Sequence, residues 1–325
     1  MKIAYTLRFG ALILSALIAS SANSHEPVHV DQNPVPVPLT QESTDEVIEG
    51  DAERYERLTV PVTIHGEGPF RFMIDTGAQA TAVTRGVEQQ LQLQPAGQAM
   101  LVGMASRELV DLVDLNEIEL GSRSIYNIQA PVLERRHVGA DGILGIDSLQ
   151  GLRVLLDFRQ DAISVADSKE LGGDKGYEIV VRARRRDGQL LITDAMIDGV
   201  RTAVIIDTGA QLSVGNLALR RKLRARLTST TTSTDVLGNT LEGDVGYVRS
   251  LEIDGLRIDN LAVSYADTPA FDALGLGKRP ALSLGMFHLR MFDRVAIDFN
   301  SRRVLFDLPP DSRRVPLGDI FRTGV

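Results

Sequence analysis

The sequence predicts an all-β protein built from two pseudo-symmetric lobes. Residues 74–79, Ile-Asp-Thr-Gly-Ala-Gln, recur letter for letter at residues 206–211, and a strand-like run leads into each copy. Each copy is then followed by further landmarks in the same order. Because an internal repeat with a fixed order of elements indicates duplication of a whole structural unit, we expect two copies of one lobe.

Each expected lobe begins with a β-hairpin that ends in the repeated turn. In the first half the run LTVPVTI is followed by a turn at residues 65–69 and then by FRFMIDTG. In the second half LLITDAMI is followed by a turn at residues 198–199 and then by TAVIIDTG. Such runs, bounded by Gly, Pro and Asp, are typical of hairpin strands. Both repeated aspartates are therefore expected at the end of a buried strand.

The elements after each turn also correspond. A short helix is expected over 86–93 and over 216–227, followed by a polar segment around Gly103 or Gly238 that would form a projecting hairpin. An apolar-apolar-glycine triplet comes next in the first half, and its counterpart in the second half begins with Ser283. The two halves then end in the matching runs SLQGLRVLLDF and HLRMFDRVAIDF, each with a closing strand, AISVAD or RRVLFDL.

The N-terminus has the layout of a secretory signal. Lys2 and Arg8 precede an apolar run over residues 9–19, and small residues follow. That run is well short of the roughly 20 residues that span a bilayer, so we expect cleavage, export to the periplasm or beyond, and no membrane span in the mature protein. The predicted organisation is a signal peptide 1–24, an extended proline-containing leader 25–52, a first lobe 53–166, a linker 167–176, a second lobe 177–309 and a tail 310–325.

The amino-acid composition narrows the kinds of partner and of site that the chain can have. The chain has 325 residues, a formal net charge of −8 and a pI near 5.3, which argues against a nucleic-acid partner. It contains no cysteine, so disulfides, thiolate nucleophiles and Cys-based metal sites are excluded. Its five histidines lack metal-ligand spacing. We expect no metal and no cofactor.

Two copies of one acidic turn suggest a catalytic pair, Asp75 and Asp207. A glycine after each Asp-Thr lets backbone N–H groups approach the carboxylate, and each Thr hydroxyl can bond across to the partner turn. If the turns meet, ionising both neighbouring carboxyl groups at once is unfavourable, so the two groups share one proton. Such a pair holds a base and an acid together, which suits hydrolysis of an amide by an activated water. The residues alone do not assign the shared proton to either aspartate.

The order IDTGA, then GILGID, then a strand ending in LLDF resembles the retropepsin-like aspartic proteases, especially the bacterial exported members, over both halves of the chain. The resemblance implies β-barrel lobes with short helices, one catalytic aspartate per lobe, an active-site cleft between the lobes and a hairpin flap over the cleft. It makes Asp75 and Asp207 the catalytic pair and places candidate flaps at Gly103 and Gly238. The residues it implies as supports of the pair are Thr76, Gly77, Ala78, Thr208, Gly209, Ala210, Ile143, Leu144, Gly145, Leu284 and Gly285.

Two features qualify this resemblance. Ser283 departs from the family pattern, because a serine stands where the triplet has its first apolar residue. Ala78 and Ala210 follow the retropepsin pattern, whereas pepsin-like enzymes usually carry Ser or Thr there. Because those hydroxyls would favour the ionised pair, their loss predicts a mildly acidic pH optimum, above that of pepsin-like enzymes.

The function implied is that of an exported aspartic endopeptidase with a peptide or protein substrate. The alternative is a non-catalytic peptide-binding or scaffolding protein on the same two lobes. A short linker gives the lobes of one chain a high effective concentration, so a monomer with intramolecular pairing is favoured over a homodimer.

Overall fold

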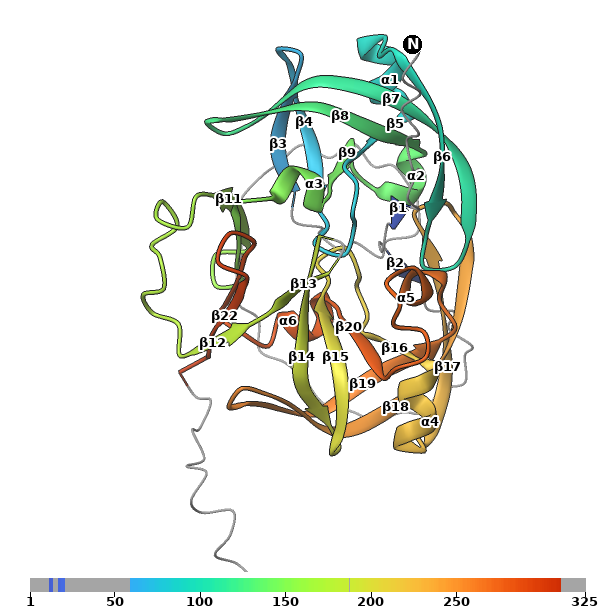
Figure 1. Ribbon diagram of the computed structural model, residues 1–325, viewed down its shortest axis with the longest axis vertical. Coiled ribbons are helices and arrows are strands. Elements are labelled where there is room, and N and C mark those ends of the chain that lie inside the picture. The colour runs from blue at the N-terminus through green and yellow to red at the C-terminus, as the bar shows by residue number, and fades with distance from the viewer. Residues whose placement is uncertain (1–11, 14–16, 21–58, 187, 311–325) are drawn as a thin grey trace, which may run out of the picture.

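The computed structural model describes residues 12–13, 17–20, 59–186 and 188–310. Two β-rich lobes lie one above the other, and a third, smaller sheet joins them at one side (Figure 1). The predicted leader, the tail beyond residue 310 and most of the predicted signal peptide lie outside the described residues.

The first lobe contains a closed barrel of six strands. The strands follow the order β7-β3-β4-β9-β5-β8, and pairing of β8 with β7 closes the ring. Strand β6 lies outside the ring, against β7. The elements are β3 Thr59–Ile64, β4 Glu67–Ile74, β5 Ala82–Thr84, α1 Arg85–Leu91, β6 Pro95–Val102, β7 Arg107–Leu120, β8 Arg123–Leu133, α2 Arg135–Val138, β9 Gly142–Leu144 and α3 Ile146–Leu149.

The second lobe repeats this barrel. Its ring is β18-β14-β15-β20-β16-β19, closed by pairing of β19 with β18, and β17 lies outside it as β6 does in the first lobe. The elements are β13 Arg184–Arg186, β14 Gln189–Ile197, β15 Val200–Ile206, β16 Val214–Asn216, α4 Leu217–Leu223, β17 Leu227–Asp235, β18 Thr240–Ile253, β19 Leu256–Ala266, α5 Pro269–Ala273, β20 Ala281–Leu284 and α6 Met286–Leu289. The predicted pseudo-symmetric all-β fold is confirmed.

The sheet between the lobes draws strands from both halves. Its order is β11-β10-β21-β22-β12, with β10 Arg153–Asp157, β11 Ala162–Ala166, β12 Ile179–Arg182, β21 Arg294–Asp298 and β22 Arg303–Asp307. The central strands β10 and β21 are antiparallel, so Arg153 of the first half faces Asp298 of the second. The apolar core continues from both barrels through this sheet, as buried Phe72 of the first barrel, Val204 of the second and Val154 of the sheet show. The lobes of one chain are therefore joined by backbone pairing.

Two short strands belong to the predicted signal peptide. Strand β1, Leu12–Ile13, pairs in parallel with β6, and β2, Leu17–Ser20, pairs antiparallel with β17. Within the described residues, no helix is both long and apolar enough to cross a membrane.

Both expected helices end earlier than the sequence suggested, the first at Leu91 and the second at Leu223. The helix predicted over 216–227 forms only as α4, because Arg224 takes a left-handed conformation with φ of 50° and its N–H returns to the carbonyl of Arg220. Asn216 begins the helix by accepting a hydrogen bond from the Leu219 N–H. The chain is extended again from Leu227, where β17 begins.

Candidate active site

The two Asp-Thr-Gly turns meet at the junction of the lobes and are linked by their threonines. The Thr76 hydroxyl donates to the carbonyl oxygen of Ile206 at 2.7 Å, and the Thr208 hydroxyl donates to that of Ile74 at 2.7 Å. Each hydroxyl also accepts the backbone N–H of the opposite threonine, at 3.1 and 3.2 Å. Four buried hydrogen bonds thus fix one turn against the other. This is the cross-bonding expected of the two hydroxyls.

Both carboxylates are buried and held in the same way. Asp75 is 0% exposed and Asp207 is 1% exposed. Oδ1 of Asp75 accepts the N–H groups of Gly77 and Ala78 at 2.8 and 2.9 Å, and Oδ1 of Asp207 accepts those of Gly209 and Ala210 at 3.1 Å each. Hydrogen bonds from N–H groups favour the charged form of a carboxyl group, which offsets part of the cost of burial.

The Asp75 carboxyl group packs directly against the opposite turn. A Cβ atom added at Gly209 would lie 2.3 Å from Cγ of Asp75, so no larger residue fits there. The glycine of the second turn therefore makes room for the carboxylate of the first.

Residues 143–145 and 283–285 contact the two turns through backbone hydrogen bonds. The Asp75 N–H donates to the Leu144 carbonyl oxygen, and the Asp207 N–H donates to that of Leu284, at 3.1 and 3.0 Å. Strand β9 pairs with β4 and β20 pairs with β15, in the same parallel register. A Cβ on Gly145 would come within 2.4 Å of the Ala80 backbone, and one on Gly285 within 2.5 Å of Leu212. Both glycines are required by close backbone contact.

The two braces differ in the side chains behind them. The Gly145 N–H donates to the Thr81 hydroxyl, which also bonds Asp147. Burial raises the pKa of the Asp147 carboxyl, although hydrogen bonds from Thr81 oppose the shift. In the second lobe the Gly285 N–H donates to the Ser213 hydroxyl, whose partner is Nδ1 of His288 at 2.7 Å.

Burial lowers the pKa of His288, which favours the neutral ring in the folded protein. His288 is 3% exposed and bonds to the brace of the second lobe, a role that no sequence pattern indicates.

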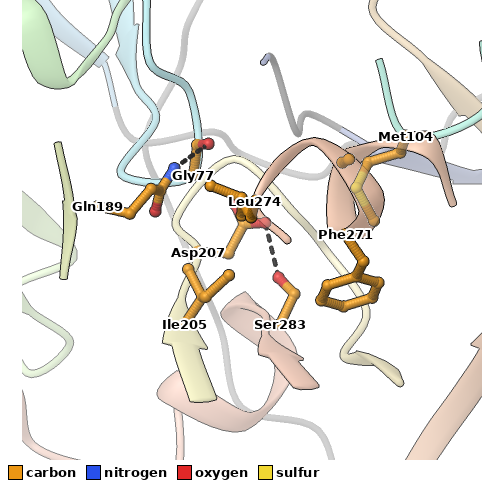
Figure 2. Close-up of a pocket in the computed structure, with 9 residues that line it drawn as sticks. Gly77, Met104, Gln189, Ile205, Asp207, Phe271, Leu274 and Ser283 are labelled. Carbon is orange, nitrogen blue, oxygen red and sulfur yellow. Dashed lines mark hydrogen bonds between the residues drawn. The ribbon is translucent and has the colours of Figure 1, made fainter. Parts of the chain in front are cut away.

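Ser283 has a contact that its apolar counterpart cannot make. Its hydroxyl donates to Oδ2 of Asp207 at 2.7 Å, as Figure 2 shows. In the first lobe the matching position is Ile143, since Ile143 faces Met73 just as Ser283 faces Ile205. The one visible departure from the family pattern therefore lies directly on a candidate catalytic carboxylate.

A small cavity adjoins Asp207. It holds about 20 Å³ of space for solvent, which is enough for roughly one water molecule. Polar groups at its wall include Asp207, Ser283 and Gln189, whose side-chain amide donates to the Gly77 carbonyl oxygen (Figure 2). The other residues that line it are Gly77, Met104, Ile205, Ala270, Phe271 and Leu274.

The polar segments around Gly103 and Gly238 form the tips of the β6–β7 and β17–β18 hairpins, and each tip reaches the opposite lobe. Met104, from the first hairpin, is 2% exposed and belongs to an apolar cluster with Ile205 and Phe271 of the second lobe. Val236, from the second hairpin, is 1% exposed and belongs to a cluster with Met73 and Ile143 of the first lobe. The predicted projecting hairpins are thus present, in a closed arrangement beside the paired turns.

Asp235 joins the two tips. Its Oδ2 accepts the Ala105 N–H at 3.1 Å and the Ser106 hydroxyl at 3.2 Å, both from the opposite hairpin. Its Oδ1 accepts the N–H groups of Leu237 and Asn239, at 3.0 Å each, from its own hairpin. A Cβ on Gly103 would lie 2.4 Å from Asp235 Oδ2, so the first hairpin leaves space for this side chain.

Asp235→Asn is expected to loosen contact between the hairpin tips, because the amide that replaces Oδ2 cannot accept from Ala105 and Ser106. A hydrogen bond to a charged group contributes about 1.5–3 kcal/mol, so protection of the Ala105 N–H from hydrogen exchange should fall by roughly ten-fold or more. Asp244→Asn on β18 is the matched control, since Asp244 pairs with Arg220 away from the tips. Unchanged protection of Ala105 in Asp235→Asn would show that Asp235 does not hold the tips.

The structure brings together the residues that the sequence singled out as the pair and its supports. Asp235, Gln189 and Met104 were missed, because each acts on the opposite lobe and no local pattern marks such contacts.

Fold and site together define a two-lobed β-barrel protein whose two Asp-Thr-Gly turns meet at the lobe junction with both carboxyl groups buried. The family model described as aspartyl protease matches residues 60–148 and 193–287, more than half of the chain, and the chain belongs to that family. The two matched regions confirm the prediction of two tandem lobes.

Among solved structures, the chain is similar to a retropepsin-like aspartic protease from Rickettsia conorii, with 23% identity and a TM-score of 0.28. That match covers 40% of this chain and 90% of the other. No curated protein matches the chain.

Proposed function

We propose that this protein is an aspartic endopeptidase that hydrolyses peptide bonds with a water activated by Asp75 and Asp207. The observation that carries the proposal is the joining of two intact Asp-Thr-Gly turns by reciprocal threonine bonds, with both carboxylates buried at the lobe junction. Neither turn has lost a residue that the chemistry needs. The cavity beside Asp207, with room for about one water, adds further support.

The mechanism requires one ionised and one protonated aspartate. The ionised aspartate takes a proton from the water while the water oxygen attacks the carbonyl carbon of the substrate. The protonated aspartate gives its proton to the carbonyl oxygen. When the tetrahedral intermediate collapses, the first aspartate donates its new proton to the leaving amine. The second recovers a proton from a hydroxyl of the intermediate, which restores the pair and leaves a carboxylic acid and an amine.

Substrate entry requires the hairpin tips to separate. Met104 lines the cavity beside Asp207, and Val236 packs against the first lobe, so both tips occupy space next to the paired turns. We propose that opening of the hairpins admits a peptide and that their closure excludes bulk water.

The test is digestion of a diverse peptide library by the purified protein from mildly acidic to neutral pH, followed by mass spectrometry. The double variant Asp75→Asn/Asp207→Asn, purified in the same way, controls for contaminating peptidases. We expect cleavage by the wild type alone. Absence of cleavage together with retained peptide binding would favour the alternative, a non-catalytic peptide-binding or scaffolding protein.

We further propose that the protein is exported and acts as a monomer. The N-terminal layout supports export, and N-terminal sequencing of the mature protein should find cleavage near Ala22 or Ser24. Pairing of β10 with β21 within one chain supports the monomer. A light-scattering mass near twice the chain mass of 35.4 kDa would instead support the homodimer.

A further inference from the structure

We propose that Ser283 is a positioning residue that breaks the symmetry of the aspartate pair, so that Asp207 is the ionised member and Asp75 carries the shared proton. This inference rests on the proposed function of the pair. It goes beyond that function by giving each aspartate a separate role.

The argument begins with the near identity of the two turns. Sequence, N–H donors to Oδ1, threonine bonds and bracing carbonyls correspond in the two lobes. A symmetric environment would divide the shared proton evenly between the two carboxylates. Any preference must therefore come from a side chain that differs between the lobes.

Ser283 is such a side chain, and it touches the carboxylate itself. Its hydroxyl is 2.7 Å from Oδ2 of Asp207 and the residue is 3% exposed, so water competes little for this hydrogen bond. Ile143 occupies the matching position in the first lobe and has no hydroxyl to donate. The difference between Ser283 and Ile143 therefore adds a hydroxyl donor to Asp207.

The direction of the effect follows from the hydrogen bond. A hydroxyl bound to an ionised carboxylate forms a charge-assisted bond, which is roughly twice as strong as its neutral equivalent. Oδ1 of Asp207 already accepts two backbone N–H groups, so the added donor at Oδ2 supports negative charge on both oxygens. Asp207 is thereby favoured as the base that takes the proton from water. Asp75 is left as the acid that protonates the substrate carbonyl.

Among the residues that the structure describes, the neighbouring charged groups Asp75, His288 and Asp235 do not supply the same preference. Asp75 faces Asp207 from the first-lobe turn and is its partner in sharing the proton. His288, on α6 behind the brace, bonds Ser213, and the carboxylate of Asp235 is bound by hairpin N–H groups. From α5 and the first hairpin the cavity receives apolar residues, and from β14 the neutral amide of Gln189.

The Ser283 hydroxyl also takes the place of a hydroxyl that the two turns lack. Ala78 and Ala210 carry no hydroxyl, which led to the expectation of a mildly acidic optimum. Ser283 returns a hydroxyl to one carboxylate only, from the brace rather than from the turn. The acidic limb of the pH profile, which reports ionisation of the base, should therefore depend on Ser283.

The primary test is a ¹³C NMR titration of the aspartate carboxyl carbons, assigned with Asp75→Asn and Asp207→Asn. This measurement is independent of catalysis, so it tests the proposal even if no peptide is cleaved. In the wild type we expect Asp207 to lose its proton at lower pH than Asp75. In Ser283→Ala the midpoint of Asp207 should rise by about one pH unit, the shift that one charge-assisted bond confers.

Ser283→Thr keeps the hydroxyl and should titrate like the wild type. Thr202→Val, which removes a buried hydroxyl on β15 that bonds the Val200 carbonyl, is the matched control and should leave the aspartates unchanged. If the protein cleaves peptides, the acidic limb of kcat/KM should move by the same amount in Ser283→Ala. Earlier ionisation of Asp75, or an Asp207 midpoint unmoved by Ser283→Ala, would overturn the proposal.

Discussion

Asp75→Asn and Asp207→Asn are each expected to lower kcat/KM for peptide cleavage by at least about 10³-fold, or about 4 kcal/mol of transition-state stabilisation. Each substitution removes one of two proton-transfer groups, and general acid–base catalysis alone contributes about 10²–10⁴-fold. Because the proposed mechanism uses the two groups as one proton-sharing unit, the double variant should be little worse than either single variant.

Asparagine is the informative substitution because it preserves the turn. Its Oδ1 still accepts the N–H groups of Gly77 and Ala78, or of Gly209 and Ala210, and its volume is close to that of aspartate. Steady-state kinetics should be paired with thermal melting to show that both variants fold. If one substitution abolishes cleavage and the other leaves it intact, the shared-proton mechanism is wrong.

The two acidic turns could be picked out from sequence because their signal is local and occurs twice, whereas the bracing segments were implied by the family resemblance. The Asp-Thr-Gly triplet encodes its own N–H donors, and Gly145 and Gly285 are required by contacts that any residue with a Cβ would break. Duplication then made a common turn motif informative. The repeated order of hairpin, turn, helix and triplet also predicted two matching lobes, whereas their closure into barrels was implied by the family resemblance.

The role of Ser283 and the link made by Asp235 were not predictable, for different reasons. Ser283 was visible as a departure from the family pattern, but sequence does not say that its side chain reaches Asp207 rather than solvent. Asp235 contacts Ala105 and Ser106 across the lobe junction, and such a contact exists only after both barrels have formed. Sequence patterns show the hydrophobic periodicity of a helix or strand, but they do not show which residues of another lobe it contacts.

Arg153→Met is expected to lower the free energy of unfolding by about 3–5 kcal/mol, because it leaves a buried carboxylate without its charge partner. Arg153 is 0% exposed, and its guanidinium donates to Oδ2 of Asp298 at 2.7 and 3.2 Å, across the β10–β21 pair that joins the lobes. It also bonds Asp174 in the linker. Chemical denaturation at neutral pH measures the loss.

Arg303→Met is the matched control, since Arg303 pairs with the same Asp174 at the surface of the neighbouring strand β22. An exposed pair contributes about 0–1 kcal/mol, so this variant should be close to wild type. Adding Asp298→Asn to Arg153→Met should recover part of the stability, because the neutral amide can still accept the Ser301 N–H. A loss below about 1 kcal/mol in Arg153→Met would show that the pair does not stabilise the junction.

The Arg153–Asp298 pair also makes the stability lost in Arg153→Met depend on pH. Burial alone would raise the pKa of Asp298, but hydrogen bonds from Ser301 and Arg153 outweigh it and lower the pKa below its usual value. A carboxyl group with a depressed folded-state pKa contributes stability above its unfolded pKa and loses it as the pH falls through the folded value. The difference between wild type and Arg153→Met should therefore be full at neutral pH and shrink below about pH 4. Because this sheet is one of the contacts that hold the two lobes and their paired turns together, cleavage by Arg153→Met should be lost at lower denaturant concentration than in the wild type.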